Sequence, residues 1–267
     1  MVRVRILQLT IILFLTCAAG LRAAPVTIPH GTVELVAEHN SIKPGHNFQV
    51  GLKFQLEKGW HIYWTNPGDA GQPPRVTWDL PAGLSAGAIL WPYPKVLSAF
   101  SAVDFGYEDE VLLLVPMQAN ASLKAENANL NADLKVIICQ DVCIPGKARL
   151  SLSLPVTSQA PSASATAFNE ARQKLPKPAP ASWKFQAKDG KDSFYLSGVL
   201  GRPMKQAFFF PLEEGQIDNA APQKVQPSKS GFAVELKKSN QLTKSIQHLR
   251  GVLLLTDKAY VIDAPVE

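Results

Sequence analysis

Apolar and polar residues alternate along most of the chain with the period of two that is typical of β-strands. The clearest example is the strand predicted at residues 48–56, where every second residue is apolar. Further strands are predicted at residues 32–38, 60–64, 75–80, 134–139 and 148–154, and at 111–117, where a continuous apolar run has the length of a buried strand. Turn-rich stretches separate these short strands and no helical period interrupts them. The pattern therefore predicts an all-β fold, an antiparallel sandwich, over residues 24–156.

A second β-rich region follows a linker at residues 157–181. The linker begins with Ser, Ala and Pro residues, has the pattern of a short helix at 165–175, and ends in a proline-rich spacer at 177–180. Residues 182–267 then show six more short strands, predicted at 183–187, 194–199, 207–210, 232–236, 252–256 and 260–263. This region contains no cysteine. We expect a second, smaller β-sandwich domain that packs on the first or presents it.

The N-terminus has the pattern of a secretory signal peptide over residues 1–23. A charged start with Arg3 and Arg5 precedes the apolar stretch 6–19, which is too short for a stable membrane span, and cleavage is expected near Ala23. Cys17 lies in a poor lipobox context, so a lipid anchor is not expected. No later segment reaches 18 apolar residues. We expect an exported, periplasmic protein without a transmembrane segment in the mature chain.

Composition and charge narrow the possible partners. With 46% hydrophobic and 18% charged residues among 267, the chain is expected to form a packed core that needs no disulfide for folding. The formal net charge of +5 falls to +2 once the leader arginines Arg3, Arg5 and Arg22 are removed. No block of Lys and Arg is interleaved with aromatic residues, so a nucleic-acid partner is not expected.

Cys139 and Cys143 are the two cysteines expected in the mature chain, and three residues separate them. A disulfide needs Cα atoms about 4.4–6.8 Å apart, whereas residues four apart on one straight strand lie about 13 Å apart. Strand patterns run into Cys139 and out again beyond Cys143. The simplest solution is a hairpin in which the two cysteines face each other, because facing residues of an antiparallel pair lie about 4.5–5.5 Å apart.

The small stabilisation expected from this disulfide suggests what the bond is for. Loop entropy gives a ring of this size only about 2 kcal/mol of stabilisation, which is little for a chain of this length. Such a bond is better suited to being opened and closed, although a small structural disulfide remains the alternative. Exchange needs a thiolate, a partner cysteine in reach and controlled access, and the sequence leaves open whether Cys139 or Cys143 attacks.

Other chemistry with the same cysteines fits the sequence less well. Two thiolates can hold a soft ion such as Cu(I), so copper handling stays open as an alternative. A closed zinc site needs four ligands, and the five histidines of the chain are scattered. A Cys-His hydrolase would leave the second cysteine unexplained. We therefore expect no metal and no cofactor.

Two other segments contain candidate residues. In residues 60–64, Trp60, Ile62 and Trp64 are expected in the core, so that His61 and Tyr63 point outward together. Residues 98–107 are interpreted as a loop. Within it, the run Asp104, Phe105, Gly106 and Tyr107 is either a plain turn or a lid whose phenylalanine covers a reactive sulfur.

Taken in order, the runs at 59–64, 91–92, 104–107 and 139–143 resemble the N-terminal periplasmic domain of the thiol:disulfide interchange protein DsbD. The runs Asn66-Pro67-Gly68-Asp69-Ala70-Gly71 and Cys143-Ile144-Pro145-Gly146 look most like the branch associated with suppression of copper sensitivity, the ScsB type. The resemblance covers residues 32–156 well. Residues 181–264 are similar, more weakly, to the second β domain of that branch.

The resemblance implies an immunoglobulin-like fold whose cysteine pair relays electrons. It implies that Cys139 and Cys143 are the redox pair and that His61 and Tyr63 stand where the family places two aromatic residues, with His61 a departure from tyrosine. It implies that Phe105 is the aromatic residue of a cap loop, flanked by Asp104, Gly106 and Tyr107.

The resemblance also implies a partner. The chain ends at Glu267 without the family's membrane-embedded and thioredoxin-like domains. We therefore expect a thioredoxin-fold oxidoreductase or a separate membrane electron-transfer protein to exchange electrons with Cys139 and Cys143. A binding or scaffold module with a structural disulfide is the first rival hypothesis, and a copper-handling protein is the second.

Overall fold

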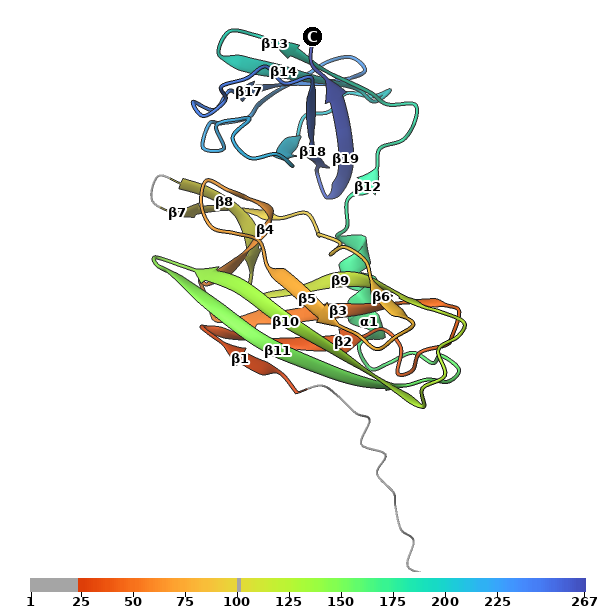
Figure 1. Cartoon of the computed structure of the whole chain (residues 1–267). Coiled ribbons are helices and arrows are strands. Elements are labelled where there is room, and N and C mark those ends of the chain that lie inside the picture. Colours follow the sequence, from red (N-terminus) through yellow and green to blue (C-terminus); the bar gives the residue numbers. More distant parts are fainter. Residues whose placement is uncertain (1–23, 100–101) are drawn as a thin grey trace, which may run out of the picture.

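The computed structural model describes residues 24–99 and 102–267, which form two β domains (Figure 1). The predicted signal peptide at 1–23 lies outside this range. Two sheets make up the first domain and two more make up the second. The predicted all-β, immunoglobulin-like fold followed by a second β domain is confirmed.

The first domain is a sandwich of two antiparallel sheets. In spatial order, one sheet contains β1 (Val26–Ile28), β2 (Gly31–Ala37), β3 (Asn47–Leu56), β9 (Glu110–Ala119) and β6 (Leu84–Ala86). The other contains β11 (Cys143–Pro155), β10 (Asn127–Cys139), β4 (His61–Gly68), β8 (Ala102–Glu108) and β7 (Lys95–Ala99), with β5 (Arg75–Asp79) paired to β10. Alternate residues of β10, such as Leu130 and Leu134, are buried between the sheets, while their neighbours face solvent. This alternation is the period of two seen in the sequence.

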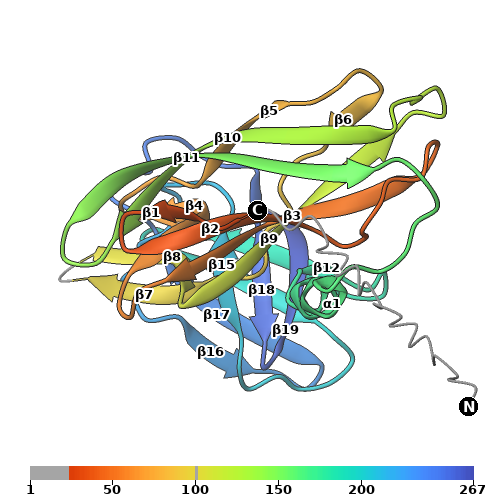
Figure 2. The same cartoon turned by 90° about the horizontal axis from the view of Figure 1, so that it is seen from below.

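The predicted linker is packed against the first domain rather than free. Its helix is α1 (Ala165–Gln173), which Figure 2 shows nearly end-on. Phe168 of α1 is fully buried against Leu112 and Leu114 of β9. Arg172 donates hydrogen bonds to Glu38 Oε1 at 2.6 Å and to Gln49 Oε1 at 2.7 Å. These contacts fix the start of the connection between the domains.

The second domain contains two four-stranded sheets around its own apolar core. One sheet consists of β12 (Lys177–Pro178), β19 (Lys258–Pro265), β18 (His248–Leu255) and β15 (Phe208–Pro211). The other consists of β13 (Lys184–Asp189), β14 (Ser193–Val199), β17 (Gly231–Lys237) and β16 (Lys224–Pro227). The proline-rich spacer is therefore part of a sheet, because β12 pairs with β19 in parallel.

The prediction of a loop at residues 98–107 is wrong. The structure has a hairpin there, in which β7 pairs with β8 and β8 pairs with β4. Asp104 and Gly106 suggested a turn, but they occupy one face of β8 while Phe105 and Tyr107 occupy the other. The residues whose small and polar side chains suggested a turn therefore lie within a strand, with successive side chains on opposite faces.

An aromatic contact joins the two domains. The ring of Phe210, on β15, packs edge-on against Trp64 and Phe105 of the first domain, with centroids 6.1 and 5.2 Å away. All three side chains are almost completely buried. Figure 1 shows β4 and β8 on the side of the first domain that faces the second. The first domain's core therefore continues into the second domain through β4 and β8.

Candidate redox site

A disulfide between Cys139 and Cys143 closes the tip of the β10–β11 hairpin. The two residues are the last facing pair of the ladder, with Cα atoms 4.2 Å apart and an S–S distance of 2.02 Å. Cys139 is 1% exposed, whereas Cys143 is an exposed residue. The predicted hairpin is present, and it gives the two cysteines unequal access to a partner.

Tyr63 contacts the exposed cysteine. Cys139 pairs across the sheet with His61 at the start of β4, so the side chain two residues later lies on the same face of the sheet. The Tyr63 hydroxyl lies 3.5 Å from Cys143 Sγ. A disulfide sulfur carries no hydrogen, so the phenol is the donor in this contact.

His61 and Asp104 form a buried pair next to Tyr63. His61 Nε2 lies 3.9 Å from Asp104 Oδ2, beyond hydrogen-bond distance, and both side chains are nearly inaccessible. Burial lowers the pKa of His61, although the charge of Glu108 partly offsets this. Burial also raises the pKa of Asp104. Both shifts disfavour the charged forms, and at 3.9 Å the two groups make no hydrogen bond, so we interpret the pair as a close contact rather than as a hydrogen-bonded ion pair.

The phenol of Tyr63 keeps its proton throughout the physiological range. Burial, with a smaller contribution from the charge of Asp104, raises the pKa of Tyr63 to about 12. Its ring also meets the ring of His61 edge-on at 5.1 Å. A phenol that stays protonated can donate to a neighbouring thiolate without losing its own proton.

His61 and Tyr63 share one face, as expected, but neither is open to solvent. Gly71 lies against the Tyr63 ring, and a Cβ placed on Gly71 would overlap that ring. Gly106 of β8 pairs with Tyr63, and a Cβ there would overlap the backbone carbonyl of Ile62. Gly71 therefore makes room for the tyrosine ring beside the disulfide, and Gly106 lets β8 approach the backbone of β4; the sequence reasoning missed the role of Gly71.

Phe105 lies on the opposite face of β8 from Asp104 and Gly106. Its aromatic contacts among the described residues are with Trp64 and Phe210, and none of them reaches the disulfide. The structure thus gives Phe105 the neighbours of a core residue rather than those expected of a lid. The cause is strand parity, because successive side chains of β8 point to opposite faces.

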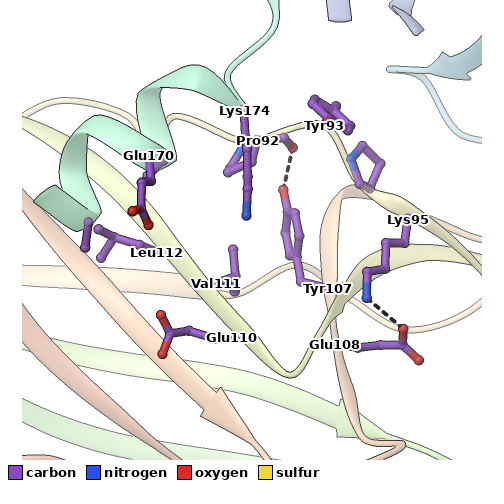
Figure 3. A pocket seen from close by; sticks show the side chains of 13 residues that line it. Pro92, Tyr93, Lys95, Tyr107, Glu108, Glu110, Val111, Leu112, Glu170 and Lys174 are labelled. Atoms are coloured by element: carbon purple, nitrogen blue, oxygen red, sulfur yellow. Dashed lines mark hydrogen bonds and ion pairs between the residues drawn. The ribbon is translucent and has the colours of Figure 1, made fainter. Parts of the chain in front are cut away.

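Tyr107 also lies away from the disulfide. Figure 3 shows it in a pocket beside α1, where its hydroxyl donates a hydrogen bond to the carbonyl oxygen of Pro92 at 2.7 Å. Lys95 and Glu108, 3.2 Å apart, line the same pocket. Of the eight residues predicted for the site, His61, Tyr63, Asp104, Gly106 and the two cysteines share one region, whereas Phe105 and Tyr107 do not.

The first domain is thus a two-sheet, immunoglobulin-like β domain with a disulfide at a hairpin tip, contacted by a buried tyrosine. Residues 32–155 match the family described as thiol:disulfide interchange protein DsbD, N-terminal, so this part of the chain is similar to that family. No curated protein sequence matches the chain.

A solved structure extends the likeness to both domains. The chain is similar to the N-terminal periplasmic domain of ScsB from Proteus mirabilis, with a TM-score of 0.67 and 18% sequence identity. The match covers 93% of this chain and 99% of that one. At this identity the similarity establishes a shared fold.

Within residues 24–99 and 102–267, no three His, Cys, Asp or Glu side chains are placed to hold one metal ion. Over the same part of the chain, none of the helices has the length and apolar character needed to cross a membrane.

Proposed function

We propose that the chain is a thiol–disulfide interchange module that exchanges electrons with a thioredoxin-fold partner through Cys139 and Cys143. The observation that carries the proposal is the unequal exposure of the two cysteines at the tip of a hairpin. An exposed sulfur can be attacked by another protein, and a buried one is kept from unwanted thiols. The match of residues 32–155 to the DsbD N-terminal family supports the same interpretation.

The exchange proceeds in two steps that conserve electrons. A thiolate of the reduced partner attacks Cys143 Sγ, the Cys139–Cys143 bond breaks, and Cys139 leaves as a thiolate that takes up a proton. A second partner thiolate then attacks the partner sulfur of the mixed disulfide. The partner leaves with its own disulfide, and Cys143 is released as a thiolate. In the opposite direction, the Cys143 thiolate attacks an oxidised partner and Cys139 resolves the intermediate.

Tyr63 acts on the charged form of Cys143. Its hydroxyl already lies 3.5 Å from the sulfur in the oxidised state, and hydrogen bonds to a charged acceptor are stronger than those to a neutral one. Donation to the thiolate lowers the pKa of the Cys143 thiol and makes it a better leaving group. His61 and Asp104 supply the buried surroundings that hold this phenol.

The partner and the compartment follow from the same proposal. A thioredoxin-fold oxidoreductase or a separate membrane electron-transfer protein supplies or accepts the electrons. The similar ScsB structure is described as a periplasmic domain, and the signal-peptide pattern of residues 1–23 points to the same compartment. We propose a periplasmic protein without a lipid anchor.

Trapping the mixed disulfide tests the proposal. The Cys139→Ser variant, with Cys143 free, is incubated with a thioredoxin-fold protein that keeps only its attacking cysteine, carried as a mixed disulfide with thionitrobenzoate. The Cys143 thiolate displaces thionitrobenzoate, no second partner thiol reverses the bond, and the adduct is followed on a non-reducing gel. We expect an adduct with Cys139→Ser and little or none with the matched Cys143→Ser variant, because the remaining Cys139 is buried. Equal adducts from both variants, or no adduct from either, would contradict the proposed order of attack or the relay itself.

A further inference from the structure

The run Asn66-Pro67-Gly68-Asp69-Ala70-Gly71 connects the redox site to the second domain. Asn66 is 1% exposed, and its Nδ2 donates a hydrogen bond to the carbonyl oxygen of Pro211 in the second domain at 2.9 Å. Its Oδ1 accepts one from the Gly68 N–H at 3.0 Å. Because both the nitrogen and the oxygen of this buried amide are hydrogen-bonded, Asn66 fixes the path of the chain where β4 ends.

Asp69 links the two domains through a single carboxylate. Its Oδ2 accepts a hydrogen bond from the Val103 N–H at 2.8 Å, and its own N–H donates to the Val103 carbonyl oxygen at 3.1 Å. Its Oδ1 accepts a hydrogen bond from Asn219 Nδ2 of the second domain, also at 2.8 Å. The Ala70 N–H donates to Asp104 Oδ1 at 3.0 Å, which fastens the next residue to β8.

Gly71 then lies directly on the ring of Tyr63. Its φ of +84° is in the region that favours glycine, and a Cβ at this position would overlap the phenol ring. Tyr63 in turn contacts Cys143 Sγ. A continuous series of contacts thus runs from Asn219 through Asp69 and Gly71 to Tyr63 and the exposed sulfur.

We propose that the second domain holds residues 69–71 against Tyr63 and thereby sets the reactivity of Cys143, with Asn219 as the positioning residue. The inference rests on the proposed function and gives the second domain a part in it. Without the Asn219 contact, the 69–71 turn is held by the first domain alone, and the phenol it covers is free to move away from the sulfur. Donation to the Cys143 thiolate then weakens.

The thiolate fraction of Cys143 tests this inference in the full two-domain chain. In the Cys139→Ser background, the rate of alkylation by iodoacetamide is measured against pH, with and without Asn219→Ala. We expect Asn219→Ala to raise the pKa of the Cys143 thiol, so that the thiolate fraction at pH 7 falls about two- to tenfold, the effect of one net hydrogen bond. A change of stability alone would move the thermal unfolding midpoint but leave this pH profile in place.

Two glycine variants provide a matched comparison. Gly71→Ala forces the Tyr63 ring away from its position, so it should shift the pH profile at least as far as Asn219→Ala does. Gly201→Ala introduces the same kind of backbone strain, at a φ of +78°, but its Cβ meets nothing within 4 Å. The profile of Gly201→Ala should match that of the parent chain.

The outcomes separate this inference from the proposed function. If Asn219→Ala leaves the profile unchanged while Gly71→Ala shifts it, the second domain does not act on the site and the inference is wrong, although the relay can still hold. If Gly201→Ala shifts the profile as much as Gly71→Ala, the effect comes from strain and the inference also fails. If Cys143 forms no mixed disulfide with a thioredoxin-fold protein, the proposed function fails first.

Discussion

The two faces of β4 and β8 differ sharply although they alternate residue by residue. One face carries His61, Tyr63 and Asp104 beside the disulfide, and the other carries Trp64 and Phe105 packed against the second domain. Both faces are buried, so burial alone does not distinguish the site from the core. The difference lies in what is buried at each place: His61, Tyr63 and Asp104 beside the disulfide, and the apolar rings of Trp64 and Phe105 beside the second domain.

The contrast separates a face whose burial stabilises the fold from the face to which we assign the proposed redox chemistry. Burial of apolar rings is favourable, whereas burial of a polar group without a partner costs free energy. His61 Nε2 has no hydrogen-bond partner among the described residues, and the pKa values of His61 and Asp104 are shifted toward the neutral forms. Such an arrangement is poor for stability, and shifted ionisable groups of this kind cluster at functional sites.

Replacing Phe105 should give the largest effect on stability. Phe105→Ala removes a fully buried ring that contacts Trp64 and Phe210, and we expect the free energy of unfolding to fall by about 3–5 kcal/mol. Urea denaturation followed by fluorescence measures this loss. The rate at which dithiothreitol reduces the disulfide in the folded variant should stay close to that of the unaltered protein. A large rise in that reduction rate with little loss of stability would show that Phe105 protects the disulfide as a lid, and would contradict its assignment to the apolar face.

On the opposite face, Tyr63→Phe should change the chemistry of the cysteine pair while leaving stability nearly unchanged. The ring remains in place while its hydroxyl is lost, so stability should change by at most about 1 kcal/mol. The pKa of the Cys143 thiol in the reduced protein should rise, because the thiolate loses a donor. The pH dependence of alkylation measures it, and Tyr195→Phe, at an exposed position of the second domain, is the control. An unchanged thiol pKa would remove Tyr63 from the mechanism.

The smallest expected effect concerns pH and His61. Because burial lowers its pKa, the unfolded chain binds a proton below the ordinary value of 6.5 that the folded chain does not bind. Stability should therefore fall as the pH drops from about 6.5 toward the pKa of His61 in the fold, and the fall should end below it. Chemical denaturation between pH 5 and 8 measures this slope, which His61→Phe should remove.

Two neighbouring charges bear on that experiment. Glu108 raises the pKa of His61 and so narrows the pH range over which the stability falls. The pKa of Asp104 is raised, so its contribution to the free energy of unfolding has the opposite sign. This contribution grows as the pH falls from the pKa of Asp104 in the fold toward the ordinary value of 3.8. If His61→Phe and the unaltered protein lose stability in parallel from pH 6.5 downward, His61 is not the buried neutral group described here.

The sequence predicted most of the architecture because period-two alternation and turn residues are local signals. It placed the strands on both sides of Cys139 and Cys143 and the hairpin that joins them, and it placed the short helix α1. It also assigned His61 and Tyr63 to one face. Chain order and spacing were sufficient for these features.

The missed features depend on contacts between distant residues. The alternation of Asp104, Phe105, Gly106 and Tyr107 is itself a strand signal, but the small and polar members suggested a turn instead. Nothing local indicates that Gly71 lies on Tyr63 or that Asn219 reaches Asp69, which is 150 residues away in the chain. Such contacts arise only once both domains are folded against each other.

The reduction potential of the Cys139–Cys143 pair tests the central claim most directly. It is measured by equilibrating the two-domain chain in glutathione and dithiothreitol buffers and counting free thiols. Structural disulfides typically lie below about −300 mV, and labile, functional ones lie above. A relay predicts a value well above that limit together with rapid exchange with a thioredoxin-fold protein. A value below it with slow reduction would contradict the account and leave a β domain whose disulfide is only a structural link.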